Sequence, residues 1–235
     1  MNISTLAQQS STPPRAALSW RAGKDGCLAW LRVCEQGIDV STFGTMCDGD
    51  GPSLSHALPR EWLARQAAAC GVTWRAVDVH RSSPGGYAAD FDRTLAELHR
   101  DGHTHRVFGD FGLAAHRDWI APRCEAAGLV PLFPLWGESR VALAQEVIAR
   151  GIQARLVAVD PRRLDAAFCG APCDAALLAR LPLGVCSCGE EGEFYIAVGF
   201  AHGMLHAVPL LDRGVQVVAS APPLSPTRIA RLAFE

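Results

Sequence analysis

The 235-residue chain carries 22 Lys and Arg against 24 Asp and Glu, which gives a formal net charge of −2. This balance argues against a nucleic-acid binder, because such proteins normally present a basic face, and no apolar run reaches the roughly 20 residues of a membrane span. Residues 1–15 lack the basic start and apolar centre of a secretory signal, so we expect a flexible tail there and a cytoplasmic protein.

The first half alternates between short strand-like runs and stretches of helical period. The pattern predicts strands at 16–20, 40–46, 72–79 and 106–109, and helices at 27–34, 60–70, 87–98 and 119–127. Gly71, Gly102 and Gly128 stand where three of these helices should end. This alternation predicts an α/β fold, a Rossmann-like parallel sheet with helices on both faces.

The second half is less regular. Residues 129–136 form an apolar run that Pro131 and Pro134 interrupt, which favours a connection or an edge strand. Ser139 is placed to cap a helix. Further elements are expected as helices at 141–150 and 174–181 and as strands at 153–159, 195–198 and 215–219. We therefore expect a smaller α+β C-terminal portion, with the chain divided into a tail (1–15) and domains at 16–130 and 131–235.

The loop between the first strand and the first helix, S-W-R-A-G-K-D-G-C at residues 19–27, is the first candidate site. Ligands of parallel sheets bind beyond the C-terminal ends of the strands. Gly23 and Gly26 permit close approach of the backbone, helix N–H groups can bind an anion, and Lys24 adds a positive charge. Phosphate is the candidate ligand. The alternative is an ordinary βα turn with a solvated lysine, and the Walker pattern is absent.

From this loop onward the chain resembles the PP-loop ATP pyrophosphatases, specifically the diphthine–ammonia ligase-like family. The family loop reads S-G-G-K-D-S, and R-A-G-K-D-G stands at residues 21–26 here. The resemblance continues in order over about residues 16–205. Its further segments are Phe108-Gly109-Asp110 followed by Arg117, Gly128-Leu129 before P-L-F-P-L-W (131–136), Leu164-Asp165 and Gly170 before D-A-A-L-L (174–178), and G-V-C-S-C-G-E-E-G-E-F (184–194) beside the family's G-V-[DN]-x-C-G-E-x-G-E-F.

The resemblance implies an adenine nucleotide alpha hydrolase-like fold, with a PP-loop ATP-binding domain at 16–130 and a substrate-binding domain at 131–235. A substrate carboxylate would attack the α-phosphate of ATP and release pyrophosphate, and ammonia would capture the acyl-adenylate to form an amide. The implied cofactors are ATP and Mg²⁺, and the implied partners are ammonia and a small-molecule or other carboxylate-bearing substrate. The resemblance does not decide whether the chain forms homo-oligomers. Such chemistry needs donors and cations around the leaving pyrophosphate and a site shielded from water.

The resemblance also implies roles for individual residues, none of them a metal ligand. The catalytic group is Lys24, Asp25, Glu190 and Glu193. The nucleotide-binding group is Ser19, Arg21, Gly23, Lys24, Gly26, Gly109 and Asp110. The substrate-binding group is His56, Arg117, Cys188 and Gly189.

The chain also departs from the family pattern at chemically active positions. The family's two loop serines are Arg21 and Gly26 here, and its first loop glycine is Ala22. Acidic residues expected before Arg117 are alanines, and the usual His-Thr after E-F is Tyr195-Ile196. These losses motivate the alternative of a catalytically degenerate nucleotide-binding or regulatory protein.

The nine cysteines are expected to be reduced thiols. Cys169, Cys173, Cys186 and Cys188 could form a four-thiolate zinc site, but their C-x₃-C and C-x-C spacings differ from the usual C-x₂-C, which favours separate buried thiols. A nucleophilic Cys188 is a second alternative, with packing favoured over it. The histidines at 99, 103, 105 and 116 allow a metal interpretation, and a solvated loop is favoured.

Overall fold

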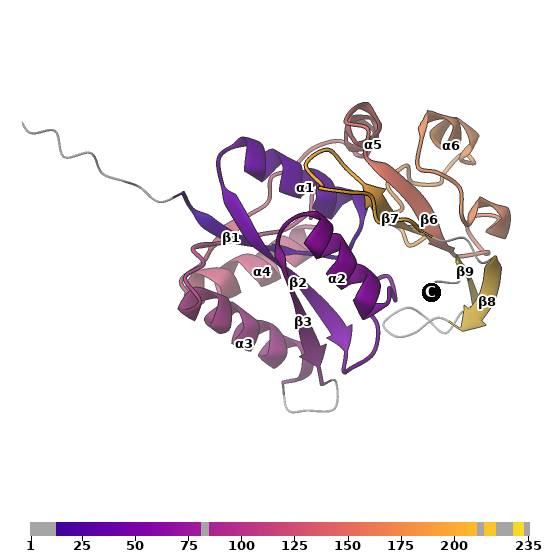
Figure 1. The fold of residues 1–235 in the computed structure, drawn as a ribbon. Coiled ribbons are helices and arrows are strands. Elements are labelled where there is room, and N and C mark those ends of the chain that lie inside the picture. The colour runs from indigo at the N-terminus through magenta and orange to yellow at the C-terminus, as the bar shows by residue number, and fades with distance from the viewer. Residues whose placement is uncertain (1–12, 81–84, 211–213, 220–227, 233–235) are drawn as a thin grey trace, which may run out of the picture.

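The computed structural model describes residues 13–80, 85–210, 214–219 and 228–232. Its first sheet has five parallel strands in the order β3-β2-β1-β4-β5. Figure 1 labels β1, β2 and β3 of this sheet. The strands are β1 (Arg15–Ser19), β2 (Asp39–Asp48), β3 (Thr73–Val79), β4 (His105–Val107) and β5 (Val130–Leu132). The short edge strand β5 carries Pro131, as the interrupted apolar run predicts.

Helices cover both faces of this sheet. The four helices are α1 (Lys24–Glu35), α2 (Arg60–Ala69), α3 (Gly86–Arg100) and α4 (Ala114–Ala126). Side chains of α1 and α2 share one apolar core with Leu18 and Phe43, and side chains of α3 and α4 share a second core with Ala17 and Phe108. Successive strand residues therefore point to opposite faces, and the predicted Rossmann-like α/β sheet is confirmed.

Helix ends largely follow the sequence signals. Gly71, Gly102 and Gly128 adopt positive φ angles just past α2, α3 and α4. The start of α4 differs from the prediction, because the helix begins at Ala114 rather than at 119. Its first turn is exposed, so it lacks the apolar period by which helices are recognised.

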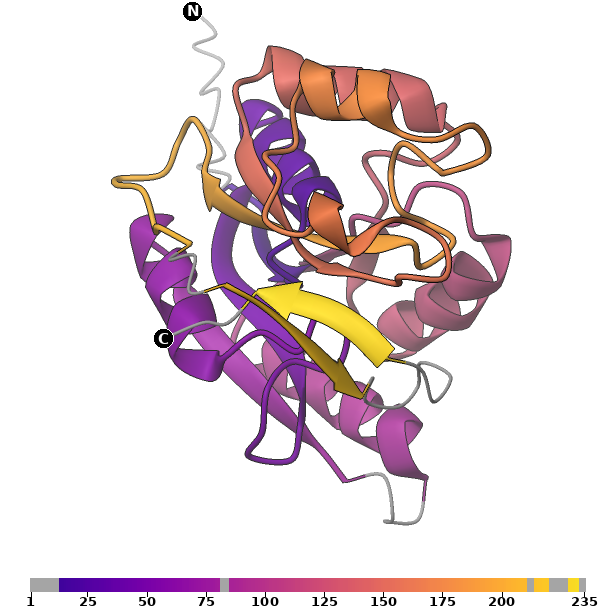
Figure 2. The same ribbon diagram turned by 90° about the vertical axis from the view of Figure 1, so that its right-hand side faces the viewer.

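The second half forms a four-stranded antiparallel sheet in the order β7-β6-β9-β8. Its elements are α5 (Arg140–Ala149), β6 (Gln153–Val159), the 3₁₀ helix η1 (Ala166–Phe168), α6 (Ala175–Arg180), β7 (Phe194–Phe200), β8 (Val215–Ala219) and β9 (Arg228–Leu232). Ser139 caps α5 by accepting from the Ala142 N–H at 3.1 Å. Figure 2 shows α5 and α6 together at one end of the molecule. The sequence did not predict β9, whose arginines interrupt any apolar run.

One apolar core joins the two sheets, with Leu18 and Phe43 in the same cluster as Leu156 and Val198. The Val198 N–H donates to the Ala22 carbonyl oxygen at 2.9 Å, which ties β7 to the loop after β1. The expected domain boundary at 130/131 falls inside β5. The fold therefore brings the second sheet directly against the loop that the sequence marks as a candidate site.

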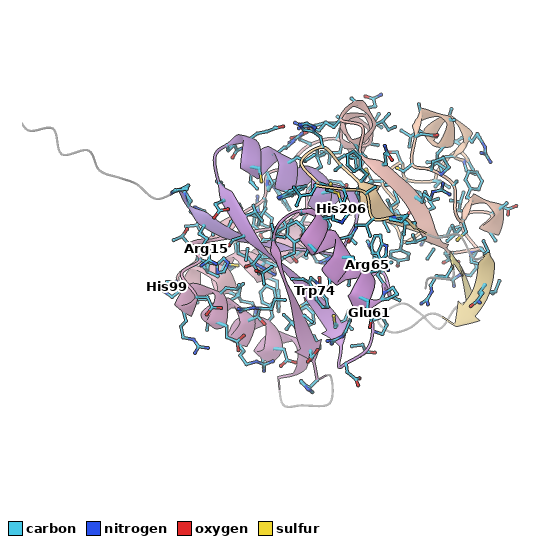
Figure 3. The ribbon with its side chains drawn as sticks, in the orientation of Figure 1. Arg15, Glu61, Arg65, Trp74, His99 and His206 are labelled. Carbon is cyan, nitrogen blue, oxygen red and sulfur yellow. The ribbon has the colours of Figure 1, made fainter. Side chains whose placement is uncertain are left out.

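Hydrogen bonds also fix the sheet beneath this loop. Trp74 of β3, labelled in Figure 3, donates from Nε1 to Thr45 Oγ1 at 3.1 Å, and that hydroxyl donates to the Trp20 carbonyl at 2.9 Å. None of the nine cysteines, all within described segments, forms a disulfide. Among the described residues, no helix is both long and apolar enough to cross a membrane.

Candidate functional site

A polar cavity of about 280 Å³ opens beyond the C-terminal ends of β1 and β4. Strand order reverses between these two strands, which is where open α/β sheets bind ligands. The lining comes from four segments: the β1–α1 loop and first turn of α1 (within 19–26), residues 55–56, residues 109–116 and residues 188–196. We call this space the polar cavity, and residues 184–193 the 184–193 loop.

The β1–α1 loop reaches the cavity through one left-handed residue. Ala22 has φ 63° and is fully buried, whereas no positive φ occurs at Gly23 or Gly26. The permissive backbone position is therefore not at the two glycines that the sequence suggested. Gly23 begins α1 as its N-cap with no capping side chain, so the first N–H groups of the helix lack a side-chain acceptor. These donors and the positive end of the helix dipole border the cavity.

Gly109 holds this helix end against β4. A Cβ at Gly109 would lie 2.8 Å from the Gly26 nitrogen and 2.9 Å from the Asp25 carbonyl carbon. Only a glycine allows that approach, because real Cβ contacts are longer. The sequence placed Gly109 among the ligand-binding residues, and its geometric function is close packing of two backbones.

Lys24 is 2% exposed, and all its donors point to protein acceptors. Its ammonium donates to Asp25 Oδ1 (2.8 Å), Asp25 Oδ2 (2.7 Å) and the Cys188 carbonyl oxygen (3.0 Å). Burial alone would lower the pKa of Lys24. The electrostatic attraction of Asp25, Cys188 and Glu190 is larger in sum, so the pKa of Lys24 lies above its ordinary value. A lysine ammonium has three donors. Lys24 therefore fastens α1 to the 184–193 loop and is not a mobile charge.

The 184–193 loop is shaped by Gly189 and Glu193. Gly189 has φ 72°, and a Cβ there would lie 2.7 Å from the Phe194 carbonyl oxygen. Glu193 is 2% exposed, and its carboxylate accepts from the Cys186 and Glu191 N–H groups, each at 3.0 Å. Glu193 does not line the polar cavity and orders the loop instead. The catalytic role that the resemblance implies for Glu193 therefore has no support in this geometry.

Cys188 lies at the cavity wall with a protonated thiol. Burial raises the pKa of Cys188 to about 11, against the opposing effect of Lys24, and its Sγ donates to the Arg140 carbonyl at 3.1 Å. A thiol in this state is a poor nucleophile, so packing accounts for it better than catalysis does. In the described segments, no three or more His, Cys, Asp or Glu side chains are arranged to hold a metal ion.

Asp25, Asp110 and Glu190 supply the acidic side of the cavity. The pKa of Glu190 is raised by its partial burial and by the nearby Asp25 carboxylate, with a smaller effect of Asp110. Mg²⁺ is commonly held by one or two carboxylates together with substrate phosphates. One or two of these carboxylates, rather than all three together, suit that mode of binding, in which the phosphates of the ligand complete the coordination.

Arg21 and His56 form another part of the wall. Arg21 is exposed, and within the described segments its guanidinium makes no hydrogen bond or ion pair. His56 packs on Gly23, where a Cβ would lie 3.1 Å from its Cε1. Its Nδ1 is buried with no partner among the described residues. Burial, Arg21 and Lys24 lower the pKa of His56 to about 3, so the imidazole is neutral.

Sequence reasoning missed the pairing of His116 with Asp110. Their Nδ1 and Oδ1 atoms are 3.0 Å apart, and both residues line the cavity. The histidine was grouped with three others, whereas His99, His103 and His105 do not line this cavity. The available signal was its spacing in the sequence, six residues after Asp110, an acidic residue that directly follows the strand predicted at 106–109. A carboxylate that contacts one ring nitrogen leaves the other free for a ligand.

A second space, the apolar pocket of about 420 Å³, adjoins the polar cavity. The two share Ser19, Arg21 and Ser55 in their linings. The rest of the apolar pocket is formed by Trp20, Thr45, Met46, Leu54, Val79 and Tyr87. The site therefore combines a charged compartment with one suited to an apolar or aromatic group.

Twelve of the fourteen residues that the resemblance implied line the polar cavity; Arg117 and Glu193 do not. The Arg117 guanidinium lies 4.2 Å from the centre of the Trp136 ring, a cation–π contact. The structure thus brings residues 19–26, 109–110 and 188–190 together from distant parts of the chain. No known family model and no curated protein matches this chain.

Proposed function

We propose that this chain binds a nucleoside triphosphate, with ATP expected, across the two joined spaces and uses it to activate a carboxylate for amide formation with ammonia. The observation that carries the proposal is that the polar cavity and the apolar pocket are joined, with three residues in both linings. An uncapped helix N-terminus and the free guanidinium of Arg21 border the polar cavity, and an apolar pocket continues from it past Ser19 and Ser55. A phosphate chain suits the first compartment and a planar base suits the second.

Each residue has a specific task in this proposal. The N–H groups at the start of α1 and the Arg21 guanidinium bind phosphate oxygens and stabilise negative charge on leaving pyrophosphate. Asp25, Asp110 and Glu190 face the polyphosphate with its Mg²⁺, which supplies charge neutralisation when bound. The Asp110–His116 pair lies on the same wall and can accept a proton at the free ring nitrogen.

The same proposal includes membership in the adenine nucleotide alpha hydrolase-like group. The α/β fold and the resemblance of the site residues support it. The geometry of Lys24 supports the second candidate, a nucleotide-binding or regulatory protein without turnover. All three ammonium donors have acceptors within the protein. A phosphate would have to displace Asp25 or the Cys188 carbonyl to reach them.

Calorimetric titration with ATP and with tripolyphosphate, each with Mg²⁺, tests binding. Arg21→Met is the informative variant because Arg21 is exposed and its loss should leave the fold intact. Loss of one charge-assisted contact predicts roughly tenfold weaker binding of both ligands. Arg163→Met, an exposed arginine outside both spaces, serves as the control.

Pyrophosphate release in the presence of ammonium and a carboxylate library then separates the two candidates. Release above an Arg21→Met background supports the ligase, and tight ATP binding without release for any carboxylate supports the regulatory protein. If neither ATP nor tripolyphosphate binds the native chain, both candidates are wrong.

A further inference from the structure

We propose that Arg106 recognises the base of the bound nucleotide by donating hydrogen bonds to a ring nitrogen or carbonyl oxygen at the floor of the apolar pocket. The inference rests on the proposed nucleotide binding and adds a specificity residue that the sequence did not indicate. It starts from an arginine that the fold leaves buried and incompletely paired.

Arg106 of β4 is 2% exposed, and its Nε and Nη1 atoms are buried with no hydrogen-bond partner in the described part of the chain. Buried polar groups are nearly always hydrogen-bonded, so two orphan donors on one charged group are exceptional. The nearest aromatic contact is Phe108, whose ring centre lies 5.7 Å from the guanidinium carbon. That contact leaves the N–H groups unused.

Among the described residues, no carboxylate is found in the set of charged and titratable groups that act on Arg106. The groups that influence it are Tyr87 of α3, Cys124 of α4 and a second cation, Arg75 of β3. Burial dominates and lowers the pKa of Arg106 to about 10, so the side chain is still a cation at neutral pH. An uncompensated buried cation destabilises a fold. Its presence is readily explained if a ligand supplies the missing acceptors.

The sheet register places Arg106 beneath the apolar pocket. Its side chain crosses from β4 over β1 to Gly44 of β2, where a Cβ would lie 3.0 Å from Nη1. Gly44 pairs with Ser19, and Ser19, Thr45 and Met46 all line the pocket. Tyr87 also lines the pocket. Burial raises the pKa of Tyr87, and the positive charges of both Arg21 and Arg106 act in the opposite direction. Arg106 itself is not in the lining, so contact requires its flexible side chain to swing from Gly44 toward Ser19.

The test uses Arg106→Met, which keeps much of the side-chain volume and removes the charge. Removal of an unpaired buried charge should raise the melting temperature, by about 3 °C for a chain of this size. The same variant should bind ATP roughly tenfold to a hundredfold more weakly, since hydrogen bonds from charged donors are lost. Tripolyphosphate, which has no base, should bind the variant and the native chain equally.

Arg75→Met is the matched control, because Arg75 of β3 is the register partner of Gly44 and is already paired with Asp101 and Glu97. It should leave ATP affinity unchanged. If Arg106→Met lowers the melting temperature, or binds ATP as tightly as the native chain, the inference is wrong while nucleotide binding stands. The inference is also wrong if the native chain binds ATP no more tightly than it binds tripolyphosphate, which has no base. Failure of the native chain to bind either ligand overturns the proposed function together with the inference.

Discussion

Lys24 shows how one buried side chain can hold together segments far apart in the sequence. Its ammonium joins Asp25 at the start of α1 to the Cys188 carbonyl in the 184–193 loop. The Asp25 side chain is 22% exposed, so water screens part of this pair, whereas the carbonyl contact is buried. Its contribution is thus to position the cavity wall.

Lys24→Met should therefore lower the free energy of unfolding by about 2–3 kcal/mol, because it leaves a carboxylate and a carbonyl without their donor. Urea denaturation measures this loss. The double variant Lys24→Met/Asp25→Asn should recover part of it, since the unpaired charge is then gone. A Lys24→Met protein as stable as the native chain but with weaker ATP binding would show instead that Lys24 is a phosphate ligand.

His56 makes stability depend on pH. Its pKa is about 3 in the folded protein, chiefly because of burial, against an ordinary value of 6.5. Between these values the unfolded state binds a proton that the folded state does not. Stability should therefore fall as the pH falls from about 6.5 toward 3, at up to about 1.4 kcal/mol per pH unit.

His56→Gln should flatten this part of the profile, as measured by urea unfolding at a series of pH values. The exposed His202 provides the comparison, and His202→Gln should retain the native slope. An unchanged slope in His56→Gln would mean that other groups produce the acid sensitivity.

At the level of elements, the contact between β4 and α1 determines the shape of the polar cavity. Gly109→Ala places a methyl group 2.8 Å from the Gly26 nitrogen, so the helix end and the strand must separate. The expected result is a loss of about 2–3 kcal/mol in unfolding free energy, in the range of overpacked cores, and weaker ATP binding.

Gly112→Ala is the matched control for this substitution. Gly112 lines the same cavity three residues later, but a Cβ there meets nothing within 4 Å. Its effect on stability should stay within about 0.5 kcal/mol. Equal effects of the two substitutions would contradict the close approach of β4 and α1.

The same elements show what the sequence could predict. The periodicity was sufficient for the parallel sheet, its helices and the glycine stops, because these depend on local pattern. Two features of the site depend instead on contacts between distant segments, which no local pattern reveals. The left-handed backbone at Ala22 contacts β7, and the Lys24 ammonium donates a hydrogen bond to the Cys188 carbonyl oxygen of the 184–193 loop. The pairing of His116 with Asp110 was hidden in the same way, by an exposed first helical turn.

At the level of the whole molecule, a band of charged side chains reinforces the junction of the two halves. Arg32 of α1 pairs with Glu138 and Glu146, and Arg150, the C-cap residue of α5, pairs with Glu146 and Glu35. These pairs are partly exposed, so each contributes little alone, but they share partners across α1 and α5. The larger stabilising term is the apolar core beneath them, which contains residues of both sheets.

A shared core predicts that the two sheets unfold in one cooperative step. All six tryptophans lie between residues 20 and 136, so their fluorescence reports on the parallel-sheet half. The buried Cys169, Cys173 and Cys188 report on the other half through their reactivity with a thiol reagent, resolved by peptide mass spectrometry. Both signals should change at the same urea concentration, because exposing either sheet uncovers apolar side chains of the other. Thiols that react well before the fluorescence changes would show that the second sheet unfolds independently, as two separate domains would.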